Sequence, residues 1–371
     1  MAETDWGALA AHQKKVWASQ AWKQARDNSF WFQSGFMGAG TSDTTKPIHY
    51  VKELTATERG DKCLMHLVPD MLEDGTVGDN ILEGREEALS ADDEEITLDQ
   101  LRHAAKSRGQ MSEQRTVIRF RETARDKLGN WWAQKIDELG FLTASGIAYT
   151  SNLDGSTRSP GSQLPSLAFA AGVTAPSTNR KVFAGGVAST ASLTTAEKMT
   201  WNFVLSVAAS ARRKRVKPLN TKGKEAYILL MSTEQARDLK ADSGYQTNVG
   251  RAQNRGNSNP LFTGYIADVD GILVYEHPKV YTTLGTATKW GAGTNVNGAQ
   301  ALLIGAQALG FARIGQPSWN ESDNKDYGNR QGLSYGAMIG YKKPVFTSIY
   351  DGGANEDFGI MSIYTAAGAT V

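Results

Sequence analysis

The 371-residue chain carries 40 Lys and Arg against 39 Asp and Glu, so its formal net charge is only +1, and 21% of its residues are charged. Because tight nucleic-acid sites depend on many local phosphate contacts, this balance allows one basic patch but argues against a basic binding surface. Cys63 is the only cysteine, which excludes an intramolecular disulfide and a thiolate zinc site. Without a signal-peptide pattern or a membrane-length apolar run, the sequence predicts a soluble chain made in a reducing cytoplasm, folded as two or three subdomains.

The N-terminal segment 1–47 is unusually rich in aromatic residues. Residues 16–27 predict a short helix with Ala18, Ala21 and Ala25 on one side, and the glycine-rich stretch from Gly35 ends it. One short helix cannot bury seven aromatic side chains, so some must pack on another part of the chain or on another subunit. The seven aromatic residues are Trp6, Trp17, Trp22, Phe30, Trp31, Phe32 and Phe36.

Residues 48–55 and 62–69 alternate in polarity, which predicts two strands joined by a turn at 58–61. An acidic, turn-rich stretch follows at 70–95, and residues 96–109 favour another strand, with a helix as the alternative. The four adjacent acids at 92–95 are expected in a solvated loop, although carboxylates could also hold a hard cation.

The clearest predicted element is a long amphipathic helix at 112–139. Ser112 is a plausible N-cap residue, apolar residues recur every three to four positions, and Gly140 is the expected stop. Such a helix would be about 40 Å long. Gly129 would weaken it by ~1 kcal/mol relative to alanine. Residues 143–192 are rich in Ser, Thr, Gly, Ala and Pro, which predicts a long loop region.

Residues 190–318 predict a compact α/β module. A helix is expected at Thr195–Arg212, followed by a buried strand, a short helix, and a strand pair around an Asp270–Gly271 turn. The apolar stretch at 299–315 fits either a strand and a short helix or two strands. The C-terminal residues return to strand-like alternation.

Candidate catalytic patterns fail on their context. Gly332–Gly336 matches the G-x-S-x-G motif, but no helix follows Ser334, and the last histidine, His277, precedes it in the chain. The histidines also lack metal-ligand spacing. We therefore expect no enzyme, no metal and no cofactor.

Four strings resemble segments of the major capsid proteins of tailed phages, in the N4-like branch. Their order and spacing carry the resemblance, which extends over about residues 46–365. The strings are "GDNILEGREEALSADDEEITLDQLRHAAKSRGQMSEQR", "NPLFTGYIADVDGILVYEHPKV", "LLIGAQALGFARIG" and "DYGNRQGLSYGAMIGYKKPVF".

The resemblance implies the α+β Hong Kong 97-type capsid fold. Its parts would be an N-terminal arm (1–47), an E-loop hairpin with peripheral-domain strands (48–111), the peripheral domain with its spine helix at 112–139 and the Ser/Gly/Pro-rich loop (112–189), an axial domain (190–318), and strands that return to the peripheral domain (319–371). It further implies hexamers and pentamers that tile an icosahedral shell around double-stranded DNA in the virion. Portal and scaffold proteins, and for some relatives a decoration protein, would be partners, without any membrane.

A shell subunit needs large interfaces between copies, so we expect unburied aromatic residues, acids and bases to form them. The basic run 212–217 also leaves an alternative, a nucleic-acid-binding function. Within a shell, the run would instead meet an acidic partner on the next copy or make weak contact with packaged DNA. A solvated helix end is the simpler interpretation of that run. The interface candidates are Trp6, Trp17, Trp22, Trp31, Glu86, Glu87, Asp92, Asp93, Glu94, Glu95, Arg212, Arg213, Lys214 and Arg215.

Overall fold

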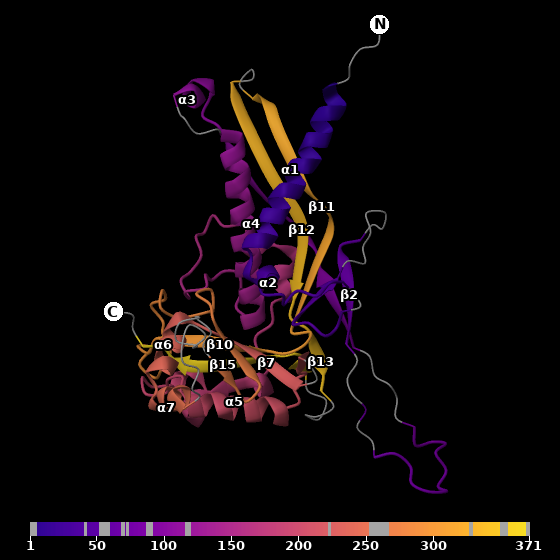
Figure 1. The fold of residues 1–371 in the computed structure, drawn as a ribbon, viewed down its shortest axis with the longest axis vertical. Coiled ribbons are helices and arrows are strands. Elements are labelled where there is room, and N and C mark those ends of the chain that lie inside the picture. The colour runs from indigo at the N-terminus through magenta and orange to yellow at the C-terminus, as the bar shows by residue number, and fades with distance from the viewer. Residues whose placement is uncertain are drawn as a thin grey trace.

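The computed structural model describes residues 6–40, 43–51, 60–67, 71, 74–86, 92–115, 120–221, 224–251, 267–325, 329–348 and 355–368. The molecule is elongated, with a tall part that contains two long helices and two long strands, and a compact part at one end (Figure 1). The α-helices are α1 (Trp6–Asn28), α2 (Phe30–Gln33), α3 (Gln110–Gln114), α4 (Phe120–Ser145), α5 (Trp201–Arg213), α6 (Thr233–Ala241) and α7 (Ser243–Arg251).

The tall part is built on a four-stranded sheet of order β1-β11-β12-β4. Its strands are β1 (Ile48–Val51), β11 (Leu309–Lys325), β12 (Arg330–Lys342) and β4 (Asp99–Lys106), and only the β1–β11 pair is parallel. Alternate β12 residues, such as Tyr335, Ile339 and Tyr341, are buried in one cluster with α1 and α4 residues. We call this sheet with α1–α4 the four-stranded unit.

The compact part is built on a seven-stranded sheet of order β5-β15-β10-β7-β9-β8, with β6 paired to β7. Residues of α5 and α6 share a second apolar cluster with the central strands, and β10 and β15 are buried along their whole length. We call this sheet with α5–α7 the seven-stranded unit. Its strands are β5 (Lys181–Phe183), β15 (Ile360–Ala366), β10 (Gly298–Ile304), β7 (Lys224–Met231), β9 (Ile272–Glu276), β8 (Ala267–Val269) and β6 (Leu219–Thr221).

Two small sheets complete the described fold. One pairs β2 (Lys62–Leu67) with β3 (Asp92–Thr97), and the other pairs β13 (Val345–Thr347) with β14 (Asn355–Asp357). The two strands predicted at 48–55 and 62–69 are present as β1 and β2, but their described residues pair with other strands: β1 with β11, and β2 with β3. Residues 58 and 59 of the turn expected between them lie outside the described residues.

Strand pairing also corrects the predicted module boundaries. The stretch 299–315 forms two strands, β10 and β11, which belong to different sheets. The C-terminal strands were all expected in the four-stranded unit, but β15 pairs with β10 and β5 in the seven-stranded sheet. Because β15 is buried on both faces, its sequence does not indicate which sheet it joins.

The long helix exists but is shifted along the sequence. Ser112 lies in the short α3, and α4 begins at Phe120 and continues past Gly140 to Ser145. It ends at Gly146, whose φ of +67° permits hydrogen bonds from Ile147 N to Leu142 O and from Gly146 N to Thr143 O. Gly140 serves packing instead, because a Cβ there would lie 2.6 Å from Trp31 Nε1.

Other local predictions hold with modest shifts. The predicted helix from Thr195 is α5, which begins at Trp201 because Thr200 is its N-cap and accepts a hydrogen bond from Phe203 N. The turn between β8 and β9 is confirmed: Asp270 and Gly271 have φ of +51° and +79°, as a two-residue hairpin turn requires. Residues 146–192 contain only short 3₁₀ helices and β5.

Candidate assembly surface

The arm helix α1 lies along α4 in the same subunit (Figure 1). Ala18, Ala21 and Ala25 are buried, as expected for a small-residue stripe that faces another helix. Gly129 of α4 matches this stripe, because a Cβ there would lie 3.2 Å from the carbonyl oxygen of Ala21. Small residues on both helices therefore let the two backbones approach closely.

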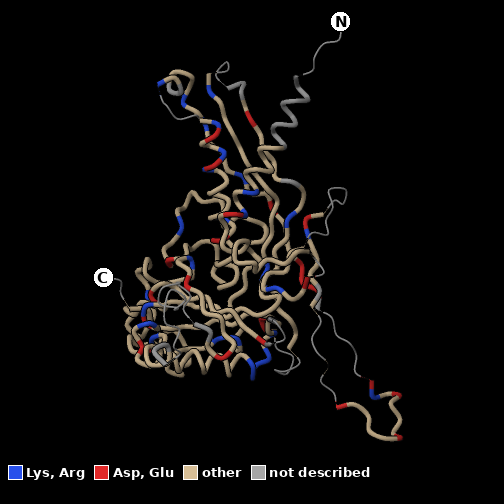
Figure 2. Tube along the Cα trace, in the orientation of Figure 1, with Lys and Arg blue, Asp and Glu red and all other residues tan. Residues whose placement is uncertain are grey.

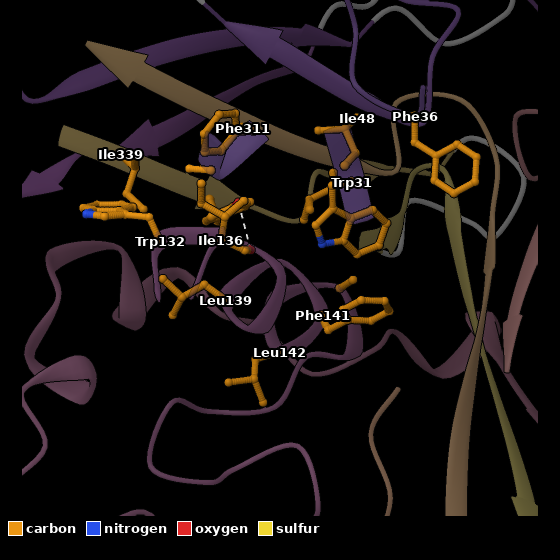
Figure 3. Close-up of a cluster of buried hydrophobic side chains, with 14 of the residues drawn as sticks. Trp31, Phe36, Ile48, Trp132, Ile136, Leu139, Phe141, Leu142, Phe311 and Ile339 are labelled. Atoms are coloured by element: carbon orange, nitrogen blue, oxygen red, sulfur yellow. Dashed lines mark hydrogen bonds between the residues drawn. The ribbon is translucent and has the colours of Figure 1, made fainter. Parts of the chain in front are cut away.

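The aromatic side chains of the arm fill the core of their own subunit. Trp22 packs edge-on against Trp132 with ring centroids 6.4 Å apart, and Trp31 lies 4.6 Å from Phe141. Figure 3 shows Trp31 and Phe36 among apolar side chains of α4 and the four-stranded sheet. Trp22 and Trp31 are thus wrong as interface candidates, because they are 7% and 1% exposed.

The remaining arm candidates differ from these two. Trp17 is half-buried and meets Trp319 of β11 edge-on at 5.9 Å, with the Arg125 guanidinium 5.8 Å from its ring. Trp6 lies in α1, but its side chain is outside what the structure describes. Neither observation places these two residues against another copy.

Residues 71 and 74–86, which we call the extended segment, lie far from both units (Figure 1). Four apolar side chains on it are exposed by 56% to 78%. Its described hydrogen bonds are local, such as Asn80 Nδ2 to Val77 O at 2.6 Å and Gly84 N to Glu86 Oε2 at 2.7 Å. The exposed apolar residues are Met71, Val77, Ile81 and Leu82.

The extended segment is also acidic, with several carboxylates and a single base along its trace (Figure 2). Glu86 is exposed at its end, and Glu87 lies outside the described residues. A loop that combines acids with exposed apolar side chains has the composition of an uncovered contact surface.

The acids at 92–95 form strand β3 and not the expected loop. Strand alternation sends neighbouring side chains to opposite faces and so divides the four acids. Glu94 accepts a hydrogen bond from Val345 N at 3.1 Å and lies 3.5 Å from Lys342 Nζ. Asp93 and Glu95 are exposed, with Glu95 Oε2 2.6 Å from Lys62 Nζ, whereas the side chain of Asp92 is not described.

Two of these observations bear on the predicted roles of the acids. The Glu95 carboxylate raises the pKa of Lys62 through its hydrogen bond, as expected for a pair that stays charged. The Glu94 carboxylate contacts Val345 and Lys342 of its own subunit, so its charge is already partnered there. In the described part of the chain, no group of three or more His, Cys, Asp or Glu side chains could hold a metal ion.

The basic run is the C-terminal end of α5. Arg215 has a φ of +50°, and Val216 N and Arg215 N donate to the carbonyls of Ala211 and Arg212, which closes the last turn as Gly146 does for α4. Val216 is buried, so the backbone of the run folds back against the end of α5. The run is therefore a helix cap with exposed cations on its outer side.

Three of the five cations in the run make contacts within the subunit, and one of them is Lys217, whose Nζ lies 5.2 Å from the centre of the Phe358 ring. Arg212 Nη1 lies 2.8 Å from Asp270 Oδ2, and this hydrogen bond raises the pKa of Arg212. Lys214 Nζ donates to the carbonyl oxygen of Asn179. Arg213 and Arg215 remain exposed.

The remaining sequence motifs show no catalytic geometry. Ser334 lies in the middle of β12, where its Oγ is 3.4 Å from Asn320 O, and not at a strand-to-helix turn. His277 instead packs against the rings of Phe30 and Phe141, with centroids 4.3 and 4.9 Å away, and these two rings also stack on each other at 5.9 Å. Within the described residues, none of the helices has the length and apolarity to cross a membrane.

Comparisons with known proteins agree with this architecture. The family model described as phage capsid protein matches residues 2–369. The major capsid protein of Pseudomonas phage KPP25 is 41% identical over 374 residues, which cover 98% of each protein. A chain from the capsid of Ralstonia phage GP4 is 27% identical, and the alignment covers 93% of this chain and 93% of that one, with a TM-score of 0.76.

More distant structures retain the same fold. A chain of the cyanophage Pam1 capsid is 18% identical, covers 94% of each chain and has a TM-score of 0.67. Both alignments extend over more than nine tenths of this chain, so the likeness covers the overall fold and not a single part of it. The chain therefore belongs to the phage capsid protein family and has the Hong Kong 97-type fold.

Proposed function

We propose that this major capsid protein of the phage virion assembles as hexamers and pentamers into an icosahedral shell around double-stranded DNA, and that the extended segment of each copy docks on a neighbouring copy. The observation that carries the docking proposal is the exposure of Val77, Ile81 and Leu82 on a segment that its own subunit leaves uncovered. Exposed apolar groups of this kind gain free energy when a partner covers them.

Charge supports the same docking. The acids of the extended segment, Glu86 among them, would face bases of the next copy, and such complementarity selects the correct register more than it adds affinity. Asp93 and Glu95 on the exposed face of β3 are further candidates for this role, together with Arg213 and Arg215. Because Trp22 and Trp31 are internal, Trp6 and Trp17 are the arm tryptophans we retain as candidate contacts.

A triple replacement tests the docking proposal. Val77, Ile81 and Leu82 are changed to serine in the full chain, and assembly is followed by electron microscopy and sedimentation. We expect a subunit with unchanged thermal stability that no longer forms shells. Leu205→Ser, which alters an exposed apolar residue on α5, is the matched control and should assemble normally. Normal shells from the triple variant would contradict the docking proposal.

Other partners follow from the proposed shell. Portal and scaffold proteins, and in some shells a decoration protein, would contact surfaces that this subunit alone does not identify. DNA would meet the inner wall through weak, non-specific contacts, because a near-neutral chain does not hold the duplex tightly and so does not impede packaging.

Nucleic-acid binding as the main function has little to support it. Arg212, Lys214 and Lys217 make contacts within the subunit, and Arg213 and Arg215 are exposed arginines of the run, so it does not form an extended basic surface. We expect Arg213→Ser with Arg215→Ser to leave shell formation intact. Duplex binding by the free subunit that is tight, falls steeply with salt and disappears in this double variant would restore the alternative.

A further inference from the structure

Asp137 is a buried carboxylate on α4 where three parts of the chain meet. It is 3% exposed. From the arm, Ser29 Oγ donates to Oδ1 at 2.6 Å and Phe30 N donates to Oδ2 at 3.1 Å. From the seven-stranded unit, Lys279 Nζ lies 3.3 Å from the same Oδ2.

The contacts on the arm side fix the start of α2. Ser29 is fully buried and occupies the N-cap position of α2 without capping it through its own side chain. Asp137 takes that role, because it accepts the otherwise unpaired amide of Phe30. Trp31 Nε1 adds a longer hydrogen bond to Asp137 O at 3.4 Å. The path of the chain from α1 into the core thus depends on one side chain of α4.

Aromatic contacts join the same three parts. His277, in the turn that follows β9, packs against both Phe30 of the arm and Phe141 of α4. Phe36 of the arm meets Tyr275 of β9 edge-on at 5.9 Å. Arm residues 29–36 therefore lie between α4 and the end of β9, and contact both.

A buried carboxylate that loses one partner is left with charge that is no longer compensated, and this costs free energy and weakens the packing held by its remaining partners. Phe30 N and Lys279 Nζ share one oxygen atom, so the position of either donor sets the geometry that is available to the other. Groups in one such network are energetically coupled, and the coupling is reciprocal.

We propose that Asp137 couples the docking of arm residues 29–36 to the placement of the seven-stranded unit on α4. A change in the angle between the two units moves Lys279 and loosens the arm. In the reverse direction, displacement of the arm frees the 277–279 turn. The subunit thereby has a built-in connection between its arm and its interdomain angle, which does not depend on how copies contact one another.

Hydrogen–deuterium exchange of the full-length subunit tests the coupling in both directions. In Lys279→Met, amide exchange of residues 29–36 should accelerate by roughly tenfold, which corresponds to about 1.4 kcal/mol. In Ser29→Ala, exchange should accelerate at residues 277–280, on the other side of Asp137. Lys240→Met is the matched control, since Lys240 pairs with Glu276 at 3.1 Å on the exposed end of β9 and does not contact Asp137.

The results that overturn the proposal are equally specific. Unchanged exchange at 29–36 in Lys279→Met would remove the coupling, as would an equal effect in Lys240→Met. If Lys279→Met also accelerates exchange in β10, the variant has loosened the whole fold and does not test the coupling. The exchange of residues 277–280 in Ser29→Ala then tests it. A Ser29→Ala variant whose faster exchange is confined to the arm would show that the two sides of Asp137 are independent.

Discussion

The arm and the extended segment are both rich in apolar side chains, and both were expected to reach beyond their own core, yet they end in opposite environments. The arm buries Trp22 and Trp31 within its own subunit, whereas Val77 and Ile81 of the extended segment are almost fully exposed. The difference lies in what each faces, since the small-residue stripe of α1 matches Gly129 of α4, and Trp31 of α2 packs on Gly140 of α4.

The extended segment lacks such a matching surface. Gly75, Gly78 and Gly84 have positive φ values, so they break any regular face, and Asp79 separates Val77 from the adjacent pair Ile81 and Leu82. Apolar content alone therefore does not distinguish a segment that packs within its own subunit from one that contacts another copy. What distinguishes them is whether the same chain provides a complementary surface.

The largest expected effect is on the arm side of this comparison. Trp31→Ala should destabilise the subunit by about 3–5 kcal/mol, the usual result of removing a fully buried tryptophan from a core. Leu82→Ala in the extended segment should change stability by less than about 0.5 kcal/mol. Chemical denaturation of both variants measures the contrast. Equal effects would mean that the two regions are not differently buried.

A smaller effect is expected from Gly140→Ala. The added methyl group would meet the indole of Trp31, and overpacking of this kind costs about 1–3 kcal/mol, against a gain of up to ~1 kcal/mol in helix propensity. Gly161→Ala, where nothing lies within 4 Å of the new Cβ, is the control. A Gly140→Ala variant more stable than the parent would show that α4 does not need this glycine for the arm.

The smallest effect concerns pH. Burial lowers the pKa of His277 to about 4 from its ordinary 6.5, and Lys279 acts in the same direction while Asp137 opposes it. The neutral ring is thus favoured in the fold. The contribution of His277 to the free energy of unfolding is fully present above pH 6.5 and is lost as the pH falls from 6.5 toward 4. Because solvent screens this half-buried ring, we expect a loss of about 1 kcal/mol at pH 5.

His277→Phe retains an aromatic ring in contact with Phe30 and Phe141 but removes the titration. Thermal unfolding of both proteins at pH 7 and pH 5 measures the effect. The parent should lose more stability than the variant between the two values, because titrating carboxylates affect both proteins alike. An identical loss would mean that His277 accepts its proton as easily in the fold as in the unfolded chain.

Local signals predicted much of the fold. The Asp270–Gly271 turn, the buried strand β7 and the existence of a long helix all follow from patterns over a few residues. Strand partners did not follow, because the pairing of β15 with β10, or of β1 with β11, joins residues far apart in the sequence. Gly140 was misinterpreted for the same reason, since its partner Trp31 lies more than a hundred positions away.

The candidate surface was predicted less well than the fold. The acids of the extended segment were identified from composition, but its exposed apolar residues were not, because their exposure depends on the absence of a covering element. Asp137 was also missed. The sequence could have indicated it, because an acid on the apolar side of a predicted helix is unusual. It could not have indicated the partners, because Ser29 and Lys279 come from distant segments.

The structure of an assembled particle, determined by electron cryomicroscopy, tests the central claim most directly. We expect α1 to lie on α4 of its own copy, with Trp31 buried, while Val77, Ile81 and Leu82 are covered by a neighbouring copy. A particle in which the extended segment remains exposed to solvent, or in which Trp31 has left its core to contact another copy, would contradict this account.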